Sequence, residues 1–479
     1  MAKTVAPEDR VKGSWLFAYA LPGLPIAALG LPLAVYLPNF YAVEVGLGYA
    51  VAGSVFLLTR VLDIFLDPIM GVVSDRVRTP WGRRRIWMVL SVPLMVTASV
   101  MLFMPAHGTT WDTTARALVL MFVAWTMLTI SHLAWGGELS SDYHERSRVT
   151  ASREAAYIIG MFTVLLLPYL IQTQGGDKFA QIAAFGWYVI ITLPIGVAVA
   201  VWVIKERDLP PSPHISLAVA FGAIANNKPL RYVLFCDLIA GLSGGMVATL
   251  FLAMTTVGLQ LGKQASLLLL IYFAMGVLFI PPMLWVSRRL GKHRTLSISS
   301  IINFLLIPCI FLLPKGQFLP AAGLWTLFGL NMAVGPFLFR AIMADVADHD
   351  HAETGQARAG VYFAMLALTN KLGYSVAIGL SFWTLALIGF QEKAPNTPEV
   401  VGAMMLLYIV PASLVSLVVG LVMWRFPLDE KKQRELRRVI DERGVAGSAI
   451  GASTGLDLEG TKDEEAAEAM GSAVPRPAE

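Results

Sequence analysis

Long runs of apolar residues, separated by short polar segments, follow one another from about residue 15 to about residue 425. A helix that crosses the hydrocarbon layer of a membrane needs about 20 mostly apolar residues. By this rule the pattern predicts an all-α integral membrane fold with twelve membrane-spanning helices. Their expected ranges are 15–41, 47–75, 86–105, 115–139, 152–173, 180–204, 232–258, 264–287, 295–314, 319–343, 360–389 and 401–425.

The polar connections divide these helices into two sets of six. The longest connection, 205–231, contains several prolines and falls between the sixth and seventh helices. We expect an N-terminal segment over 1–14, one six-helix bundle over 15–204, a linker over 205–231, a second bundle over 232–425 and a tail over 426–479. The arginine-rich segments 82–85 and 289–294 lie at equivalent positions of the two sets. Two pseudo-symmetric bundles around a central cavity are typical of secondary transporters.

Basic residues predict the orientation of the chain. Alternating the connections between the two sides of the membrane places about 30 of the 37 Lys and Arg residues on the side of the N-terminus. The positive-inside rule makes that side cytoplasmic for both termini. We expect a multi-pass protein of the bacterial inner membrane, with an amphipathic helix over 430–443 and a disordered tail from about residue 447. The other side holds only Arg116, Lys178, Lys263, Lys315 and Lys393.

Composition excludes several classes of protein. The chain is 56% apolar and only 15% charged, whereas a soluble protein is about 25% charged. A net charge of +4 is too small for a nucleic-acid binder. The two cysteines, Cys236 and Cys309, lie in apolar runs and offer no disulfide framework or metal site. The N-terminal segment has no cleavage pattern, so we expect no removable signal peptide.

Ionisable residues inside a membrane span are costly and therefore indicate function. Asp63 and Asp67 are four residues apart in the second span, so their side chains share one face of the helix. Two such carboxylates cannot both stay ionised without a neighbouring cation, which predicts a coupling site for a proton or for Na⁺. In the alternative interpretation, Arg60 neutralises Asp63 in a static structural network.

Lys371 lies deep in the eleventh span, and no acid precedes it between Val361 and Thr369. It needs a carboxylate from another helix, and Asp63 or Asp67 is the expected partner. Such an ion pair can act as a switch, although a static salt bridge between the halves remains the alternative. Asp237 in the seventh span either lines the cavity or pairs near the cytoplasmic end. His132 in the fourth span either lines the cavity or has a packing role.

Five motifs, in this order, resemble the glycoside–pentoside–hexuronide cation symporter family of the major facilitator superfamily. The resemblance extends from about Trp15 to Arg425 and implies the two-bundle major facilitator fold, alternating access and solute import. The motifs are Arg60-Val-Leu-Asp63-Ile-Phe-Leu-Asp67-Pro-Ile-Met-Gly71, Ser74-Asp75-Arg76 with Trp81-Gly82-Arg83-Arg84-Arg85, Glu138-Leu-Ser-Ser-Asp142-Tyr-His-Glu145-Arg146, Ala344-Asp345-Val-Ala-Asp348, and Tyr362-Phe-Ala364 with Asn370-Lys371-Leu-Gly373.

The resemblance assigns the cation site to Asp63 and Asp67, with Thr126 as a further ligand and Lys371 close by. The melibiose-permease pattern has an asparagine ligand between the two acids, where this chain has Leu66. A proton needs only a carboxylate, so H⁺ is favoured over Na⁺ as the coupling ion, and no other cofactor or metal is expected.

The same resemblance implies a small solute, most directly a sugar, glycoside or uronate. The sugar-binding aspartates of the family are replaced by Ala27 and Thr129, so a lysolipid-like or other amphiphilic solute is the alternative. Residues expected to line the cavity are Tyr36, Asn39, Thr129, His132, Arg153, Asp237, Tyr362 and Asn370.

Polar residues at the cytoplasmic helix ends are expected to gate the cavity. Gly71 would allow two helices to approach closely, and the arginines after it would contact anionic headgroups. The full set is Gly71, Asp75, Arg76, Arg83, Arg84, Glu138, Asp142, Arg146, Asp345 and Asp348.

A membrane prenyltransferase-like enzyme is the alternative from another class. Its two acidic clusters would be Asp63 with Asp67, and Asp345 with Asp348 and Asp350. Such an enzyme would not explain why the chain has twelve spans in two similar halves. The sequence therefore predicts a monomeric transporter in the lipid bilayer, with a small solute as its partner, and not an enzyme.

Overall fold

The computed structural model describes residues 10–77, 79–140, 143–206, 224, 227–332, 334–354, 359–428, 432–433 and 435–436. Within this part the regular structure is entirely helical, and eleven helices, or twelve with one bent pair, are long and apolar enough to cross a membrane. Most of the expected linker (205–231), most of the expected amphipathic helix (430–443) and the tail beyond it lie outside the described residues; of that helix, residues 432–433 and 435–436 are described and are helical.

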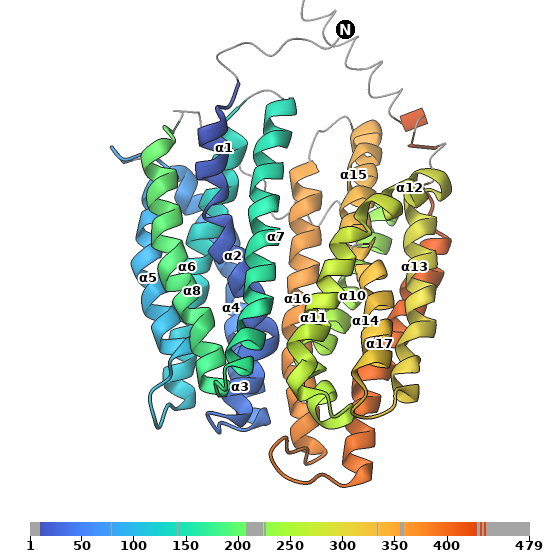
Figure 1. The fold of residues 1–479 in the computed structure, drawn as a ribbon. Coiled ribbons are helices and arrows are strands. Elements are labelled where there is room, and N and C mark those ends of the chain that lie inside the picture. Colours follow the sequence, from blue (N-terminus) through green and yellow to red (C-terminus); the bar gives the residue numbers. More distant parts are fainter. Residues whose placement is uncertain are drawn as a thin grey trace, which may run out of the picture.

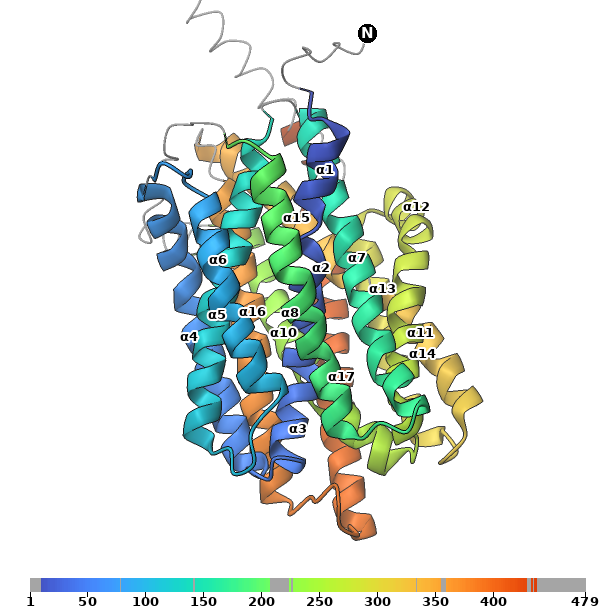
Figure 2. The same cartoon turned by 60° about the vertical axis from the view of Figure 1, so that its left-hand side comes forward.

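The helices form two bundles that stand side by side (Figures 1 and 2). The first bundle contains α1 (Gly13–Ala20), α2 (Gly23–Leu31), η1 (Pro32–Tyr36), α3 (Leu37–Val43), α4 (Tyr49–Arg76), α5 (Arg85–Phe103), α6 (Trp111–Glu138), α7 (Tyr143–Thr173) and α8 (Lys178–Val203). The second contains α10 (Lys228–Ala253), η2 (Met254–Gly258), η3 (Gly262–Gln264), α11 (Ala265–Leu278), α12 (Ile280–Leu290), α13 (Lys292–Leu306), η4 (Ile307–Leu312), α14 (Phe318–Met332), α15 (Val334–Thr354), α16 (Ala359–Leu387) and α17 (Pro398–Trp424).

Prolines explain why two of the expected spans are broken. The first span is divided into α1, α2, η1 and α3, with Pro22, Pro32 and Pro38 at or near the junctions, because proline removes a backbone donor and clashes with the preceding turn. The span formed by α11 and α12 bends by 49° at its break. Pro281 and Pro282 follow that break directly.

We call the end of the molecule that holds Arg83, Arg84 and Lys292 the basic face, and the other end the opposite face. At the opposite face, α6 begins four residues and α8 two residues before the expected span, because a polar side chain caps the first turn of each. Thr110 accepts from the backbone N–H of Thr113, and Asp177 accepts from that of Ala180.

Apolar packing joins the two bundles toward the opposite face. The larger hydrophobic core runs from the first bundle into the opposite-face ends of α10, α16 and α17, and includes Phe56, Phe251 and Phe382. A separate core that includes Leu230 and Met423 lies toward the basic face within the second bundle. Between the bundles, α4 packs along α16 and α7 along α11. The α4–α16 contact is the scaffold of the site described next.

Candidate functional site

Four side chains from three helices meet where α4 packs along α16. The Nζ atom of Lys371 lies 3.1 Å from Oδ2 of Asp63 and 2.5 Å from Oδ2 of Asp67. The hydroxyl of Thr126, on α6, lies 3.2 Å from Oδ1 of Asp63 and 3.3 Å from Oδ1 of Asp67. The two acids therefore share one helix face, and Lys371 takes its carboxylates from another helix, as the spacing in the sequence predicts.

The two carboxylates differ in their access to water. The Asp63 side chain is 7% exposed and that of Asp67 is 29% exposed, whereas the Lys371 side chain is 36% exposed. A buried ion pair is stabilising only when its charges are well matched and its remaining polar atoms are bonded. Here a single ammonium lies between two acids, and the Asp63 charge also acts on the nearby Arg60.

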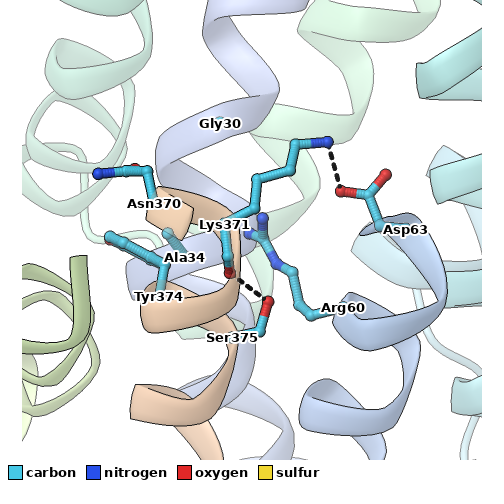
Figure 3. A pocket seen from close by; sticks show the side chains of 8 residues that line it. All are labelled: Gly30, Ala34, Arg60, Asp63, Asn370, Lys371, Tyr374 and Ser375. Carbon is cyan, nitrogen blue, oxygen red and sulfur yellow. Dashed lines mark hydrogen bonds and ion pairs between the residues drawn. The ribbon is translucent and has the colours of Figure 1, made fainter. Parts of the chain in front are cut away.

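A cavity of about 220 Å³ opens beside this ion pair (Figure 3). Its walls come from the bent first span, from α4 and from α16. One wall is polar and charged, while the other is made of small residues. The lining residues are Gly30, Ala34, Arg60, Asp63, Asn370, Lys371, Tyr374 and Ser375.

Arg60 lies in the wall of this cavity next to Asp63. Its guanidinium carbon is 5.1 Å from the centroid of the Phe122 ring, a cation–π contact. Its buried Nε has no hydrogen-bond partner among the described residues, and no ion pair joins it to an acid in that part of the chain. No direct ion pair therefore joins Arg60 to Asp63 among the described residues, although the Asp63 charge acts on Arg60, and the structural network stays the alternative interpretation.

Asp237 of α10 bonds to the two residues that precede Lys371. Its Oδ2 accepts a hydrogen bond of 2.8 Å from Thr369, and its Oδ1 accepts one of 3.3 Å from the Asn370 amide. Asp237 is buried. Asn370 lines the cavity, and its amide points away from Lys371 (Figure 3). Asp237 thus contacts α16 beside the lysine instead of pairing at the cytoplasmic end of its helix.

Three other expected cavity residues bond within the first bundle. The Nε2 atom of His132 lies 2.7 Å from the backbone oxygen of Tyr19, and the Tyr19 hydroxyl donates to the backbone oxygen of His132. Thr129 donates to the backbone oxygen of Trp125 in its own helix. The guanidinium of Arg153 lies 4.7 Å from the centroid of the Tyr157 ring. None of the three borders the cavity described above.

Tyr362, Tyr36 and Asn39 also lie outside that cavity. The hydroxyl of Tyr362 accepts a hydrogen bond from Asn227. Tyr36 is 3.1 Å from the hydroxyl of Ser266, and Asn39 is bonded to Glu392. These last two residues belong to the contact between the bundles at the opposite face, because η1 and α3 form the opposite-face end of the first span.

Glu392, in the loop after α16, is the centre of that contact. Its Oε2 accepts hydrogen bonds of 2.9 Å from the Asn39 amide and 3.4 Å from the Tyr49 hydroxyl. Burial raises the pKa of the Glu392 carboxyl, and the hydrogen bond from Asn39 only partly offsets this effect. Next to it, Lys393 forms an ion pair of 2.7 Å with Glu44. Sequence patterns gave no signal for Glu392, because it lies in a loop without periodicity.

At the basic face the polar contacts between described residues stay within one bundle. Glu138 accepts hydrogen bonds of 2.7 Å from Arg83 and 2.8 Å from Arg84. Glu206 accepts bonds of 2.7 and 2.8 Å from the backbone N–H groups of the same two arginines. In the second bundle, Lys292 lies 2.7 Å from Asp345. Arg83 and Arg84 are buried, so the expectation that they contact headgroups is wrong for these two, while Arg85 is half-buried.

The remaining gating residues have diverse surroundings. A Cβ at Gly71 would meet no heavy atom within 4 Å, so the close helix approach expected there is absent from the described structure. Arg146 donates to the backbone oxygen of Ser140, and Asp348 accepts from Gln433. Arg76 is exposed. Asp142 and the side chain of Asp75 lie outside what the structure describes.

Comparison with known proteins gives consistent matches over the whole membrane region. A family model described as "MFS/sugar transport protein" matches residues 18–430. The chain is 22% identical to the glucuronide carrier protein homolog of Escherichia coli strain K12, over 86% of this chain and 91% of that protein. It is also 22% identical to the sodium-dependent lysophosphatidylcholine symporter 1 of Homo sapiens, over 91% of this chain and 89% of that one.

Solved structures agree on the fold. A D-xylose-proton symporter superposes with a TM-score of 0.60 at 14% identity, and the match covers 88% of this chain and 98% of that one. At this identity the similarity concerns the fold alone. The major facilitator fold expected from the sequence, two bundles around a central site, is therefore confirmed.

Proposed function

The chain belongs to the MFS/sugar transport family, and on that premise we propose that it is a symporter in which entry of a sugar-like solute is coupled to a cation. One observation carries the proposal. The acids Asp63 and Asp67 of α4 share Lys371 of α16 beside a polar cavity between the bundles. A cation that binds to these acids changes the strength of a contact between the two halves of the molecule.

The geometry supports a simple switch. Without the coupling ion, the ammonium of Lys371 holds α4 against α16 through both carboxylates. A proton on one carboxylate removes half of the negative charge that attracts the ammonium, so the ion pair weakens and the helices can separate. Thr126 keeps the two carboxylates oriented toward each other. We propose that Asp237 acts as a positioning residue, because it holds Thr369 and Asn370 next to the lysine.

A proton is the coupling ion that the site favours. Hard metal cations are bound by several oxygen ligands, and the oxygens gathered here come from Asp63, Asp67 and Thr126. Leu66, between the two acids, adds an apolar side chain where a further ligand would be needed. A proton requires only one carboxylate.

The solute is proposed to be sugar-like and not amphiphilic. The residues that line the cavity include three charged ones, Arg60, Asp63 and Lys371, which suit a hydroxyl-rich molecule better than an acyl chain. The family consists of transporters, so the membrane-enzyme alternative is set aside. We place the basic face in the cytoplasm by the positive-inside rule. Since one chain supplies the entire site, a monomer is sufficient for function.

In this conformation the polar contacts between the two bundles are distributed unevenly along the molecule, as alternating access requires. Every polar contact between the bundles in the described residues lies at the ion pair or between it and the opposite face. The salt bridges of Glu138 with Arg83 and Arg84, and of Asp345 with Lys292, stay within one bundle. We propose that they keep each bundle rigid at the basic face while the bundles rock.

The test is uptake into proteoliposomes with an imposed pH gradient or an imposed Na⁺ gradient. We expect the pH gradient to drive accumulation of a sugar-like solute, and Asp63→Asn and Asp67→Asn each to abolish it. Asp112→Asn is the matched control, because Asp112 forms only an exposed ion pair with Arg116. Normal accumulation by Asp63→Asn or by Asp67→Asn would show that this acid does not take part in coupling. Uptake driven only by Na⁺ at clamped pH would contradict the proposal that the coupling ion is a proton.

A further inference from the structure

The two arginine-rich segments at equivalent positions of the bundles have different surroundings. In the first, Arg83 and Arg84 are buried and both donate to Glu138. The second segment and the residue before it carry three exposed arginines, Arg288, Arg289 and Arg294. Within the described residues none of these three is paired with an acid. The second bundle therefore keeps three positive charges at the basic face that no carboxylate of the described chain matches.

α12 holds two of these arginines away from the contact between the bundles. A bend of 49° separates it from α11, and α12 packs against α13 and the end of α11. Gly291, with a φ of 88°, ends α12 and allows the sharp turn into α13, whose first turn carries Arg294. Figure 2 shows α12 at the outer edge of the second bundle, at the basic-face end. One side of α12 therefore has no described helix packed along it.

This free side of α12 is both aromatic and basic. Trp285 is 59% exposed. Arg288 and Arg289 follow it by three and four residues, so the three side chains share one face of the helix. The guanidinium carbon of Arg289 lies 4.7 Å from the centroid of the Trp285 ring, a cation–π contact. An exposed indole beside arginines is typical of a helix at the level of the lipid headgroups.

We propose that this side of α12 binds the headgroup of an anionic phospholipid. A phosphodiester supplies the negative charge and the acceptor oxygens that the unpaired guanidinium groups lack, and arginine matches phosphate with paired hydrogen bonds. This binding site is separate from the central cavity and from the coupling ion pair. The groups involved, called the α12 patch below, are Trp285, Arg288, Arg289 and Arg294.

The order of side chains along the span favours a lipid over other anions. Exposed Leu278 and Ile280 come first, Trp285 follows, and the arginines lie toward the basic face. Acyl chain, interface and headgroup of a lipid have the same order. Free phosphate would match the arginines but leave the apolar side chains uncovered. The acidic segment 457–468 of this chain has six acids and one lysine, but Leu458 is its only large apolar side chain.

The first experiment measures lipid binding to the purified full chain in detergent by native mass spectrometry. The probes are phosphatidylglycerol and phosphatidylcholine with identical acyl chains. We expect phosphatidylglycerol to bind at least about tenfold more tightly, because each arginine near a membrane surface strengthens the attraction to anionic lipid. Equal affinities would overturn the proposal. Displacement of the bound lipid by an equal concentration of inorganic phosphate would also overturn it, since the site would then recognise phosphate alone.

Matched variants distinguish a site at α12 from a general attraction to the basic face. Arg288→Gln/Arg289→Gln is expected to lower the affinity for phosphatidylglycerol about tenfold or more and to leave phosphatidylcholine binding unchanged. Arg10→Gln/Arg148→Gln is the control, because it removes two exposed arginines of the same face and the same total charge. An equal loss in both variants would mean that only the summed charge attracts the lipid, and would contradict a site at α12.

The acidic segment is tested in the same assay. Asp463→Asn/Glu464→Gln/Glu465→Gln removes three of its charges, and we expect the affinity for phosphatidylglycerol to stay the same. A rise as large as the loss in the arginine variant would mean that this segment occupies the α12 patch in the unmodified protein, and would refute the lipid site. These readouts require no solute and no ion gradient, so their outcome is independent of the proposed symport.

Discussion

Lys371 is bonded to two carboxylates that also share one threonine, so a change in any of these side chains alters the charge felt by the other acid. Asp67 lies closer to the ammonium than Asp63 does and is more exposed to water. Asp67 is therefore the acid that water reaches more readily, whereas Asp63 is the one that lines the cavity. The two acids form one coupled site, and their protons belong to the pair.

Replacement of Lys371 is expected to change how tightly the two acids bind a proton. In Lys371→Ala the acids lose their cation, so a proton binds to them more tightly and remains bound at higher pH. We expect the pH midpoint of proton-dependent solute binding to move upward by about one unit or more, and gradient-driven accumulation to fall. Binding measured across pH in detergent checks this. A midpoint that stays in place, or moves downward, would show that Lys371 does not neutralise the pair.

The ion pair could be predicted from the sequence, whereas the contact between Asn39 and Glu392 could not. Asp63 and Asp67 could be placed on one face because a helix has a fixed period, and Lys371 needed a partner because a lone charge in a membrane is costly. Asn39 and Glu392 are 353 positions apart. No period or charge rule connects a loop glutamate with a helix asparagine, so only the folded chain brings them together.

At the scale of helices, caps and prolines explain where the expected spans differ from the observed ones. Helices expected to begin at residues 115 and 180 begin at Trp111 and Lys178, because Thr110 and Asp177 cap them. The tenth span was expected to end at residue 343, but α15 continues to Thr354. Hydropathy marks the membrane boundary, whereas the backbone hydrogen bonds of the helix continue into the polar residues beyond it.

Two glycines allow α4 and α16 to lie close together near the opposite face. A Cβ at Gly53 would be 2.7 Å from the Cβ of Phe382, and a Cβ at Gly379 would be 2.7 Å from Cδ2 of Leu57. Carbon atoms in contact prefer about 3.5–4.0 Å. The closed contact between the bundles at this face therefore depends on the missing side chains.

Gly53→Leu and Gly379→Leu are expected to separate the bundles at the opposite face while leaving each bundle folded. Spin labels on the exposed residues His107 and Lys315, one in each bundle, would report this as a longer distance. Gly402→Ala is the control, because a Cβ there meets no atom within 4 Å. An unchanged distance distribution in both leucine variants would contradict the idea that these glycines permit closure.

In the molecule as a whole, the described contacts that hold the two bundles together lie on one side of the ion pair, toward the opposite face. The larger core crosses between the bundles toward the opposite face, and Glu392 bonds to Asn39 and Tyr49 at that end. Lys178 and Glu44 act on the charge of Glu392 in opposite senses, and the adjacent Lys393 is paired with Glu44. Burial outweighs the favourable neighbours, so the Glu392 carboxyl holds its proton more strongly in the closed state than in water.

The closure should therefore depend on pH at the opposite face. Because the pKa of Glu392 is raised when it is buried, protonation favours the closed state, and this advantage is lost as the pH rises through the raised value. We expect the distance between labels at His107 and Lys315 to lengthen with increasing pH in the unmodified protein. Glu392→Gln, which resembles the protonated acid, should remain closed across the range, and Asp112→Asn should behave as the unmodified protein. A distance in Glu392→Gln that follows pH as before would assign the dependence to another group, and lengthening at acidic pH would reverse the sign of the argument.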